Sequence, residues 1–185
     1  MKTGMKKIAV SVLGPDRPGI IATVAKVLYG QGCNLEDISQ TILQNEFIGI
    51  FIASVDNSSD DGSVLAALRD AISPLQLFVH LRPLSAAAPE AFGDSFIITT
   101  VGPDRPGLVA GITEVLARYG VNITNLKAVS KGESDGRRYI MIYEVDIPAA
   151  TDYHVIRAAL YDRAGSLGLD INLQHREIFE QIHRV

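Results

Sequence analysis

Hydrophobic and polar positions along the first half of the chain follow two periods. Alternation at every second residue, as at Ile8, Val10 and Val12, is typical of a strand that buries one face. Spacing of three to four residues, as at Ile20 and Val24, is typical of a helix with one apolar stripe. The pattern predicts, in chain order, a strand over 7–13, a helix over 20–28, strands over 35–44 and 47–55 joined by a turn near Asn45, a helix carrying Leu65, Leu68 and Ile72, and a strand over 75–82.

The second half repeats this order of elements. Each half therefore indicates a βαββαβ unit, in which a four-stranded antiparallel sheet carries two helices on one face. We expect an α+β protein with two ferredoxin-like domains. The predicted elements are a strand over 96–101, a helix lined by Leu108, Ile112, Val115 and Leu116, a hairpin of 123–131 and 138–147 around 132–136, a helix carrying Tyr153, Ile156 and Leu160, and a strand through Leu169, Ile171 and Leu173.

A sequence repeat supports the duplication directly. The hexapeptide Gly-Pro-Asp-Arg-Pro-Gly occupies residues 14–19 and again residues 102–107, and 11 of the 25 positions from 14 to 38 are identical at this offset of 88. Two long units indicate a duplicated domain rather than an array of short repeats. The small residues and Pro89 between the halves predict a linker. The predicted organisation is a first domain over 5–84, a linker over 85–92 and a second domain over 93–181.

One predicted strand is apolar on both of its faces. Residues 47–53 do not alternate, and since the helices cover only one face of the sheet, we expect the other face to be covered as well. The cover is either the second half of the same chain or another protomer. The last strand of the first half, by contrast, carries Gln76, Phe78, His80 and Arg82 on one side, which predicts a partly solvated surface.

The loop between the first predicted strand and helix of each half is a candidate ligand site. Gly19 and Gly107 lack a Cβ, so a ligand can approach the backbone there. The free N–H groups of the following helix and its dipole favour a carboxylate or another small anion. Arg17 or Arg105 would add a charge-assisted contact. The presence of the hexapeptide in both halves favours a function that the two loops share.

A plain strand-to-helix turn accounts for the same residues without any ligand. Asp16 and Asp104 precede the predicted helices and would accept N–H bonds from the first turn. Pro18 and Pro106 would lie in that first turn, where a helix tolerates proline. Spacing alone leaves this interpretation and the ligand site equally open.

The motifs of both halves resemble the ACT domain. The hexapeptide follows the first strand, and Gly32-Cys33-Asn34-Leu35-Glu36-Asp37 leads into the second; Gly120-Val121-Asn122-Ile123 stands at the same place in the other half. The resemblance is to ACT domains of the type found in the glycine cleavage system transcriptional repressor and at the regulatory end of formyltetrahydrofolate deformylase. It covers nearly the whole chain apart from the linker and the termini.

The resemblance implies a regulatory module that binds a small amino acid, similar to glycine or serine, where two such units meet. In this family the ligand meets the first strand-to-helix loop and the start of the second strand. Glu36-Asp37 corresponds to Thr124-Asn125, so the two sites need not share a ligand or an affinity. The residues implied are Asp16, Arg17, Gly19, Ile20, Asn34 and Leu35 in the first half, and Asp104, Arg105, Gly107, Leu108, Asn122 and Ile123 in the second.

Composition narrows the class of protein. The 185 residues are 47% hydrophobic and 21% charged, which is typical of a folded globular chain. The net charge of −4 and the absence of a basic run argue against direct nucleic-acid binding. We find no signal peptide and no membrane-spanning segment, so we expect a soluble cytoplasmic protein. The single cysteine, Cys33, excludes an intramolecular disulfide and is interpreted as a small apolar filler rather than a nucleophile.

We find no candidate catalytic, metal or cofactor site. The four histidines (His80, His154, His175 and His183) lack metal-ligand spacing, and no nucleophile elbow or phosphate-binding loop occurs. Tyr139, Met141, Tyr143 and Val145 form one strand face that is interpreted as core or interface rather than a base-stacking platform.

The leading hypothesis is a non-catalytic amino-acid sensor that acts on a protein partner, in transcriptional control of amino-acid metabolism, and that forms a homo-oligomer. The partner would be a transcription factor. A regulatory subunit of a metabolic enzyme is the main alternative, with the enzyme as partner. An enzyme using Asp16 and Asp104 as acid–base groups, and a dimerisation module without a ligand, are further alternatives.

Overall fold

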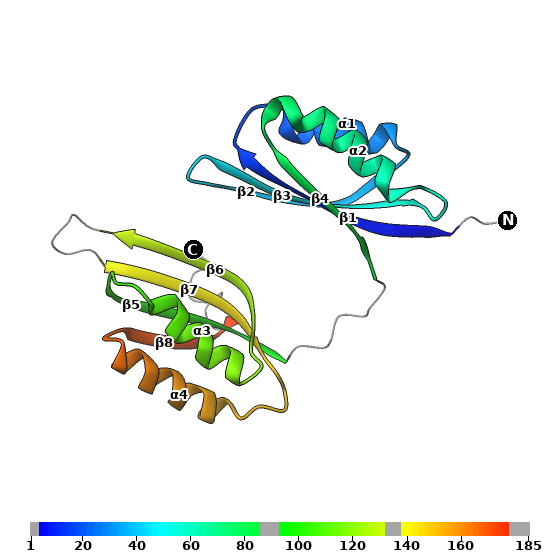
Figure 1. Ribbon diagram of the computed structural model, residues 1–185. Helices are drawn as coiled ribbons and strands as arrows, with labels where there is room; N and C mark the ends of the chain where they lie inside the picture. Colours follow the sequence, from blue (N-terminus) through cyan, green and yellow to red (C-terminus); the bar gives the residue numbers. More distant parts are fainter. Residues whose placement is uncertain (1–3, 86–92, 132–137, 178–185) are drawn as a thin grey trace. The chain divides into compact units, whose positions relative to one another are not determined.

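The chain folds into two compact units, Met1–Ala88 and Pro89–Val185. The computed structural model describes residues 4–85, 93–131 and 138–177. Each unit follows the order βαββαβ, and this confirms the predicted fold class of two ferredoxin-like domains (Figure 1). Residues 86–92 of the linker predicted over 85–92, the loop at 132–136 and the segment after 177 lie outside the described residues. No helix of the described chain is long and apolar enough to cross a membrane.

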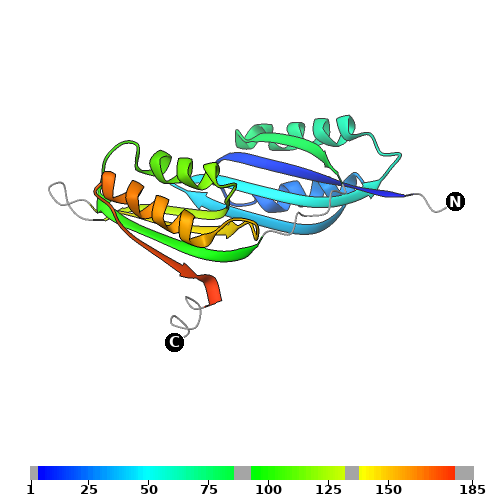
Figure 2. The same cartoon turned by 90° about the horizontal axis from the view of Figure 1, so that it is seen from below.

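The first unit is one antiparallel sheet in the order β2-β3-β1-β4. Helices α1 and α2 lie side by side on one face of this sheet (Figures 1 and 2). The elements are β1 (Met5–Pro15), α1 (Ile20–Gly30), β2 (Asn34–Leu43), β3 (Glu46–Asp56), α2 (Asp61–Ile72), the 3-10 turn η1 (Ser73–Leu75) and β4 (Phe78–Leu84).

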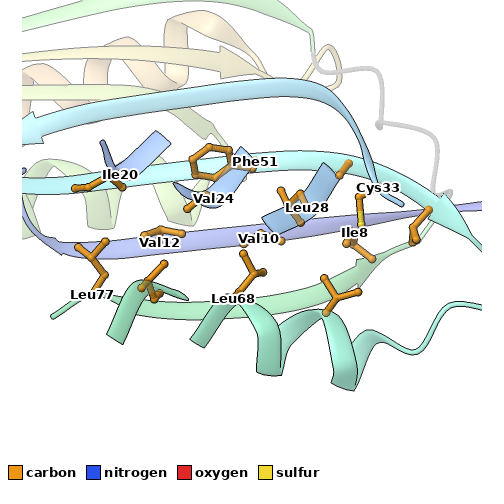
Figure 3. Close-up of a cluster of buried hydrophobic side chains, with 14 of the residues drawn as sticks. Ile8, Val10, Val12, Ile20, Val24, Leu28, Cys33, Phe51, Leu68 and Leu77 are labelled. Carbon is orange, nitrogen blue, oxygen red and sulfur yellow. The ribbon is translucent and has the colours of Figure 1, made fainter. Parts of the chain in front are cut away.

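The core of the first unit lies between the sheet and its two helices (Figure 3). Alternate residues of β1 point into it, so Ile8 and Val10 are fully buried while Ser11 is exposed. Val24 of α1 and Leu68 of α2 are also fully buried and meet the strand residues there. Burying a side chain of this kind stabilises the fold by about 1.5–3 kcal/mol. The alternation of period two in β1 therefore decides which face of the sheet receives the helices.

The second unit repeats the arrangement with the strand order β6-β7-β5-β8. The predicted apolar face of its third strand is confirmed as core, because Met141, Tyr143 and Val145 are fully buried. The elements are β5 (Asp94–Pro103), α3 (Leu108–Arg118), β6 (Asn122–Lys131), β7 (Arg138–Ile147), α4 (Tyr153–Ser166) and β8 (Asp170–His175).

The last strand of the first unit begins later than the alternation predicts. Residues 73–75 form a 3-10 turn that carries Pro74 near its start, and Gln76 follows with φ 58°. A left-handed residue interrupts an extended strand, so β4 starts at Phe78. The expectation of a solvated side on this strand is confirmed, because Phe78, His80 and Arg82 are all exposed.

The face of the first sheet opposite its helices, which we call the open face, carries the apolar residues that the sequence singled out. Ile48 and Ile50 of β3 point to this face and are 38% and 47% exposed. Leu13 of β1, which lies beside Ile48 in the sheet, is 47% exposed. The prediction that this face is covered by another unit or protomer therefore concerns a surface that the helices of its own unit leave open.

Candidate functional site

The loop between β1 and α1 is held by backbone contacts rather than by a side-chain cap. Gly19 stands at the N-cap position with φ 93°, in a region that favours glycine. No side chain caps α1, so the interpretation of Asp16 as its capping residue is wrong. Pro18 precedes the N-cap and is not in the first helical turn, which corrects that expectation too. The Asp16 N–H instead donates to the Asn45 carbonyl at 2.8 Å.

The hairpin between β2 and β3 fixes the position of this loop. Gln44 and Asn45 both have positive φ (49° and 69°), as a tight two-residue hairpin turn requires. The turn places the Asn45 carbonyl where it accepts the Asp16 N–H, and it pairs Phe47 with Gly14. Sequence-distant residues are thereby brought to the start of α1.

An open depression of about 250 Å³ lies in front of α1. A Cβ built at Gly19 would meet no atom within 4 Å, so space in front of the helix amides is free. Gln40 of β2 and Phe47 of β3 belong to this site although the sequence did not indicate them. The hairpin register would have identified both. The lining residues are Asp16, Arg17, Gly19, Ile20, Ile21, Ala22, Gln40 and Phe47.

The second unit has the same loop with different side-chain contacts. Gly107 is the N-cap of α3 with φ 89°, again without a side-chain cap, so Asp104 does not cap its helix either. Pro106 likewise precedes the N-cap. The Asp104 carboxylate accepts a hydrogen bond from the Ser130 hydroxyl at 3.1 Å. An open depression of about 590 Å³ faces this loop, and it is lined by Asp104, Arg105, Pro106, Gly107, Leu108, Val109, Ala110 and Tyr139.

The two arginines of the repeated loops reach across to the connection that follows the second helix of their own unit. Arg17 donates to the Gln76 side-chain oxygen at 3.1 Å. Arg105 donates to the Leu167 backbone carbonyl at the C-terminus of α4, an end of the helix that favours positive charge. Both side chains line their depressions and also anchor the loop to the neighbouring connection.

The structure does not bring Asn34 and Leu35 to the loop of their own unit. Strands β1 and β2 both run antiparallel to β3, and Asn34 pairs with Ser54 whereas Gly14 pairs with Phe47. Seven residues along β3 separate the two positions by about 23 Å. Leu35 packs against the core instead of lining the depression.

The second unit separates its residues in the same way. Asn122 pairs with Asp146 whereas Gly102 pairs with Tyr139, so the start of β6 lies at the far end of the sheet from the loop. Ile123 packs against the core of this unit. Each unit therefore holds two separate half-sites, one at each end of its sheet.

The half-sites at the start of β2 and β6 differ between the units. A register shift occurs after Leu35 and after Ile123, which places Glu36 and Thr124 at equivalent irregular positions. The Glu36 carboxylate lies 2.6 Å from the Lys7 ammonium, and hydrogen bonds from Lys7 and Ser54 lower the pKa of Glu36. The Thr124 hydroxyl donates to the Glu144 carbonyl at 3.2 Å. A charged group in one unit thus corresponds to a neutral one in the other.

Cys33 precedes the first of these half-sites and is buried. Burial raises the pKa of its thiol, and the carboxylate of Asp61 adds to the shift. A thiol with a raised pKa is a poor nucleophile, in agreement with the interpretation of Cys33 as a filler. No group of three or more metal-ligating side chains occurs in the part of the chain that the structure describes.

Comparison with known proteins assigns both units to one family. Models of the ACT domain match residues 6–81 and residues 96–150. A UPF0237 protein of Methanococcus maripaludis is 34% identical over 93 residues, which cover 50% of this chain and 99% of that protein.

Solved structures extend the likeness to the tandem arrangement. A protein of unknown function from Galdieria sulphuraria is 26% identical with a TM-score of 0.79, over 93% of this chain and 99% of that one. A protein provisionally assigned as a glycine cleavage system transcriptional repressor shares the fold, with a TM-score of 0.67 at 16% identity and the same coverage. ACT domains are regulatory modules that respond to small ligands. The chain belongs to the ACT-domain family, and it carries two ACT domains in tandem.

Proposed function

We propose that the protein is a non-catalytic sensor that binds a small amino acid similar to glycine or serine and thereby changes the activity of a protein partner, in transcriptional control of amino-acid metabolism. The observation that supports this most is the repeated loop. In both units the first helix starts at a left-handed glycine, carries no side-chain cap and faces an open depression.

The loop chemistry suits the two charged groups that every free amino acid carries. Uncapped N–H groups at the N-terminus of α1 would donate to the ligand carboxylate, and the helix dipole favours its negative charge. Asp16 or Asp104 would accept from the ligand ammonium in a charge-assisted bond. The side chain of a small amino acid fits a depression that is open to solvent.

Each site would be completed by residues of another ACT unit. Asn34 and the loop at Gly19 lie at opposite ends of one sheet, so a two-fold axis that pairs the β2 edges of two units would bring Asn34 of one unit to Gly19 of the other. Binding would then favour the paired arrangement over the separate one. A ligand shifts an equilibrium between two states only by its difference in affinity for them, and here that difference would arise from the shared site.

The test is thermal unfolding of the purified protein with each of the twenty amino acids at millimolar concentration. A ligand at one hundred times its Kd should add about 2.7 kcal/mol to the free energy of unfolding. Asp16→Ala or Asp104→Ala should remove the effect, whereas Asp70→Ala on the exposed side of α2 should leave it. A chain that no amino acid stabilises would contradict the sensor function.

Affinity capture with the native protein then identifies the class of partner. We expect a transcription regulator that is released or retained according to the amino acid found in the first experiment. Capture of a metabolic enzyme with the same dependence would favour the regulatory-subunit alternative.

A further inference from the structure

The open face of the first sheet has an ordered pattern of charge across its four strands. Ala9 pairs with both Arg82 of β4 and Ile52 of β3, and Ile52 pairs with Asp37 of β2. These four residues form one row across the sheet, with a base at one edge, an acid at the other and apolar residues between. Three strand spacings separate the two charges by about 14 Å.

The neighbouring rows continue the apolar centre of this face. Leu13 pairs with Ile48, and Phe78 completes that row at the β4 edge, where it is 76% exposed. Ile50, in the row between, is 47% exposed. Large apolar side chains gathered on one exposed surface are typical of an interaction site.

Neither edge charge forms an ion pair with a residue of the first unit in the described range 4–85. Lys7 and Glu36, which also lie on this face, pair with each other at 2.6 Å. Across the described ranges 4–85, 93–131 and 138–177, no ion pair involves Asp37 or Arg82. An acid at one edge and a base at the other therefore remain available to a partner.

We propose that the open face of the first sheet docks on the same face of a second copy of this chain. A two-fold axis parallel to the strands sets β2 of one copy against β4 of the other, because it reverses the order of the strands. Asp37 of each copy then meets Arg82 of the other at both rims of the interface. Ile48, Ile50 and Ile52 of β3 then face Leu13, Ser11 and Ala9 of β1 in the other copy, two apolar residues and one serine. The surface is complementary to itself, as an interface between identical subunits requires.

The open face of the second sheet does not fit this surface equally well. Its equivalent row contains Gln174, Ile97, Glu144 and Asn125, so the residues at its two edges are neutral and would form no ion pair with Asp37 or Arg82. Glu144 stands in the centre of that row and is held by Asn125 at 2.9 Å and by Arg176 at 3.4 Å. Docking the second sheet on the first would set this carboxylate against an apolar centre.

Mixing two charge-reversal variants of the full chain tests the proposal. Asp37→Arg alone and Arg82→Asp alone set like charges against each other at both rims, and each should weaken self-association by about tenfold or more. A mixture of the two variants restores both pairs and should form a mixed dimer with nearly native affinity. Sedimentation velocity measures all three samples, and Gln174→Asp on the second sheet is the control that should leave association unchanged.

Substitution in the centre of the face gives an independent measurement. Ile50→Lys should abolish the dimer, whereas Ile142→Lys on the open face of the second sheet should leave it intact. Ile50 is already half exposed, and circular dichroism checks that the variant folds. The proposal fails if the native chain is monomeric at about 100 μM, well above the micromolar Kd range of a specific contact, or if mixing does not restore the dimer. It fails as well if Ile50→Lys lowers the thermal midpoint of a monomeric chain, because the second unit would then cover the face.

Discussion

The two units have the same backbone at the candidate site and different side chains around it. Both loops end in a left-handed glycine that starts an uncapped helix. In the second unit Ser130 donates to Asp104, whereas the equivalent position of the first unit holds Ile42, whose side chain has no hydrogen-bond donor. Phe47 and Tyr139 both pair with the first glycine of the hexapeptide. Both units therefore share a loop backbone that needs glycine, while the polar contacts that would decide ligand choice differ between the units.

The largest difference in stability between the two units is expected at Val12 and Thr100, which occupy equivalent positions in the two cores. Thr100 is fully buried and its hydroxyl has no hydrogen-bond partner in the described chain, whereas Val12 is apolar. Val12→Thr should lower the free energy of unfolding by about 1–3 kcal/mol, the cost of an unsatisfied buried polar group. Thr100→Val should leave stability unchanged or raise it. Urea unfolding of both variants checks this, and an equal loss for both would contradict the difference between the cores.

The next effect concerns the shared loop conformation. Gly19→Ala and Gly107→Ala should each lower the free energy of unfolding by about 1–2 kcal/mol, because a side chain is disfavoured at positive φ. A Cβ at either position would meet no neighbour, so conformation alone should account for the loss. Gly30→Ala is the control, since this glycine is helical and has open space, and it should be neutral or stabilising. Thermal unfolding of the three variants distinguishes these outcomes.

A pH dependence should distinguish the two cores. Burial raises the pKa of Tyr143 to about 12, and the tyrosine's ordinary value in the unfolded chain is 10.0. A raised pKa in the folded state stabilises the fold fully below pH 10, and this contribution is lost as the pH rises from about 10 to 12. Phe51, which stands at the corresponding position of the first core, cannot titrate. The free energy of unfolding, measured between pH 9 and 12, should therefore fall less steeply with pH in Tyr143→Phe than in the native chain. An unchanged pH profile would contradict the assignment.

The smallest effect should appear at Ser130, which is exposed. Ser130→Ala frees the Asp104 carboxylate and makes the second loop more like the first. We expect stability to change by less than about 0.5 kcal/mol, as for most surface substitutions. If the proposed amino-acid binding holds, calorimetry should show a stronger contribution from the second site. Ile42→Ser is the reciprocal change and should weaken the first site.

Local pattern predicted most of the fold. The alternation in β1, the apolar stripe of α1 and the repeated hexapeptide located the strands, helices and duplication, because each depends on residues close in sequence. The start of β4 was predicted too early. Leu75 and Leu77 continue the alternation in the sequence, but Pro74 and the left-handed Gln76 belong to a turn that precedes the strand. Asp16 was expected to cap α1, but Gly19 takes that position.

The sequence by itself determined the two βαββαβ units, the glycine-dependent loops and the apolar character of β3. Only the tertiary structure decided which residues surround each loop and how the open face is ordered. Gln40 and Phe47 reach the first loop through strand pairing, and Asp37 and Arg82 fall in one row although 45 residues separate them in the chain. The physical reason is that periodicity reports which side of an element is buried, whereas strand register, set by tertiary pairing, determines which residues become neighbours.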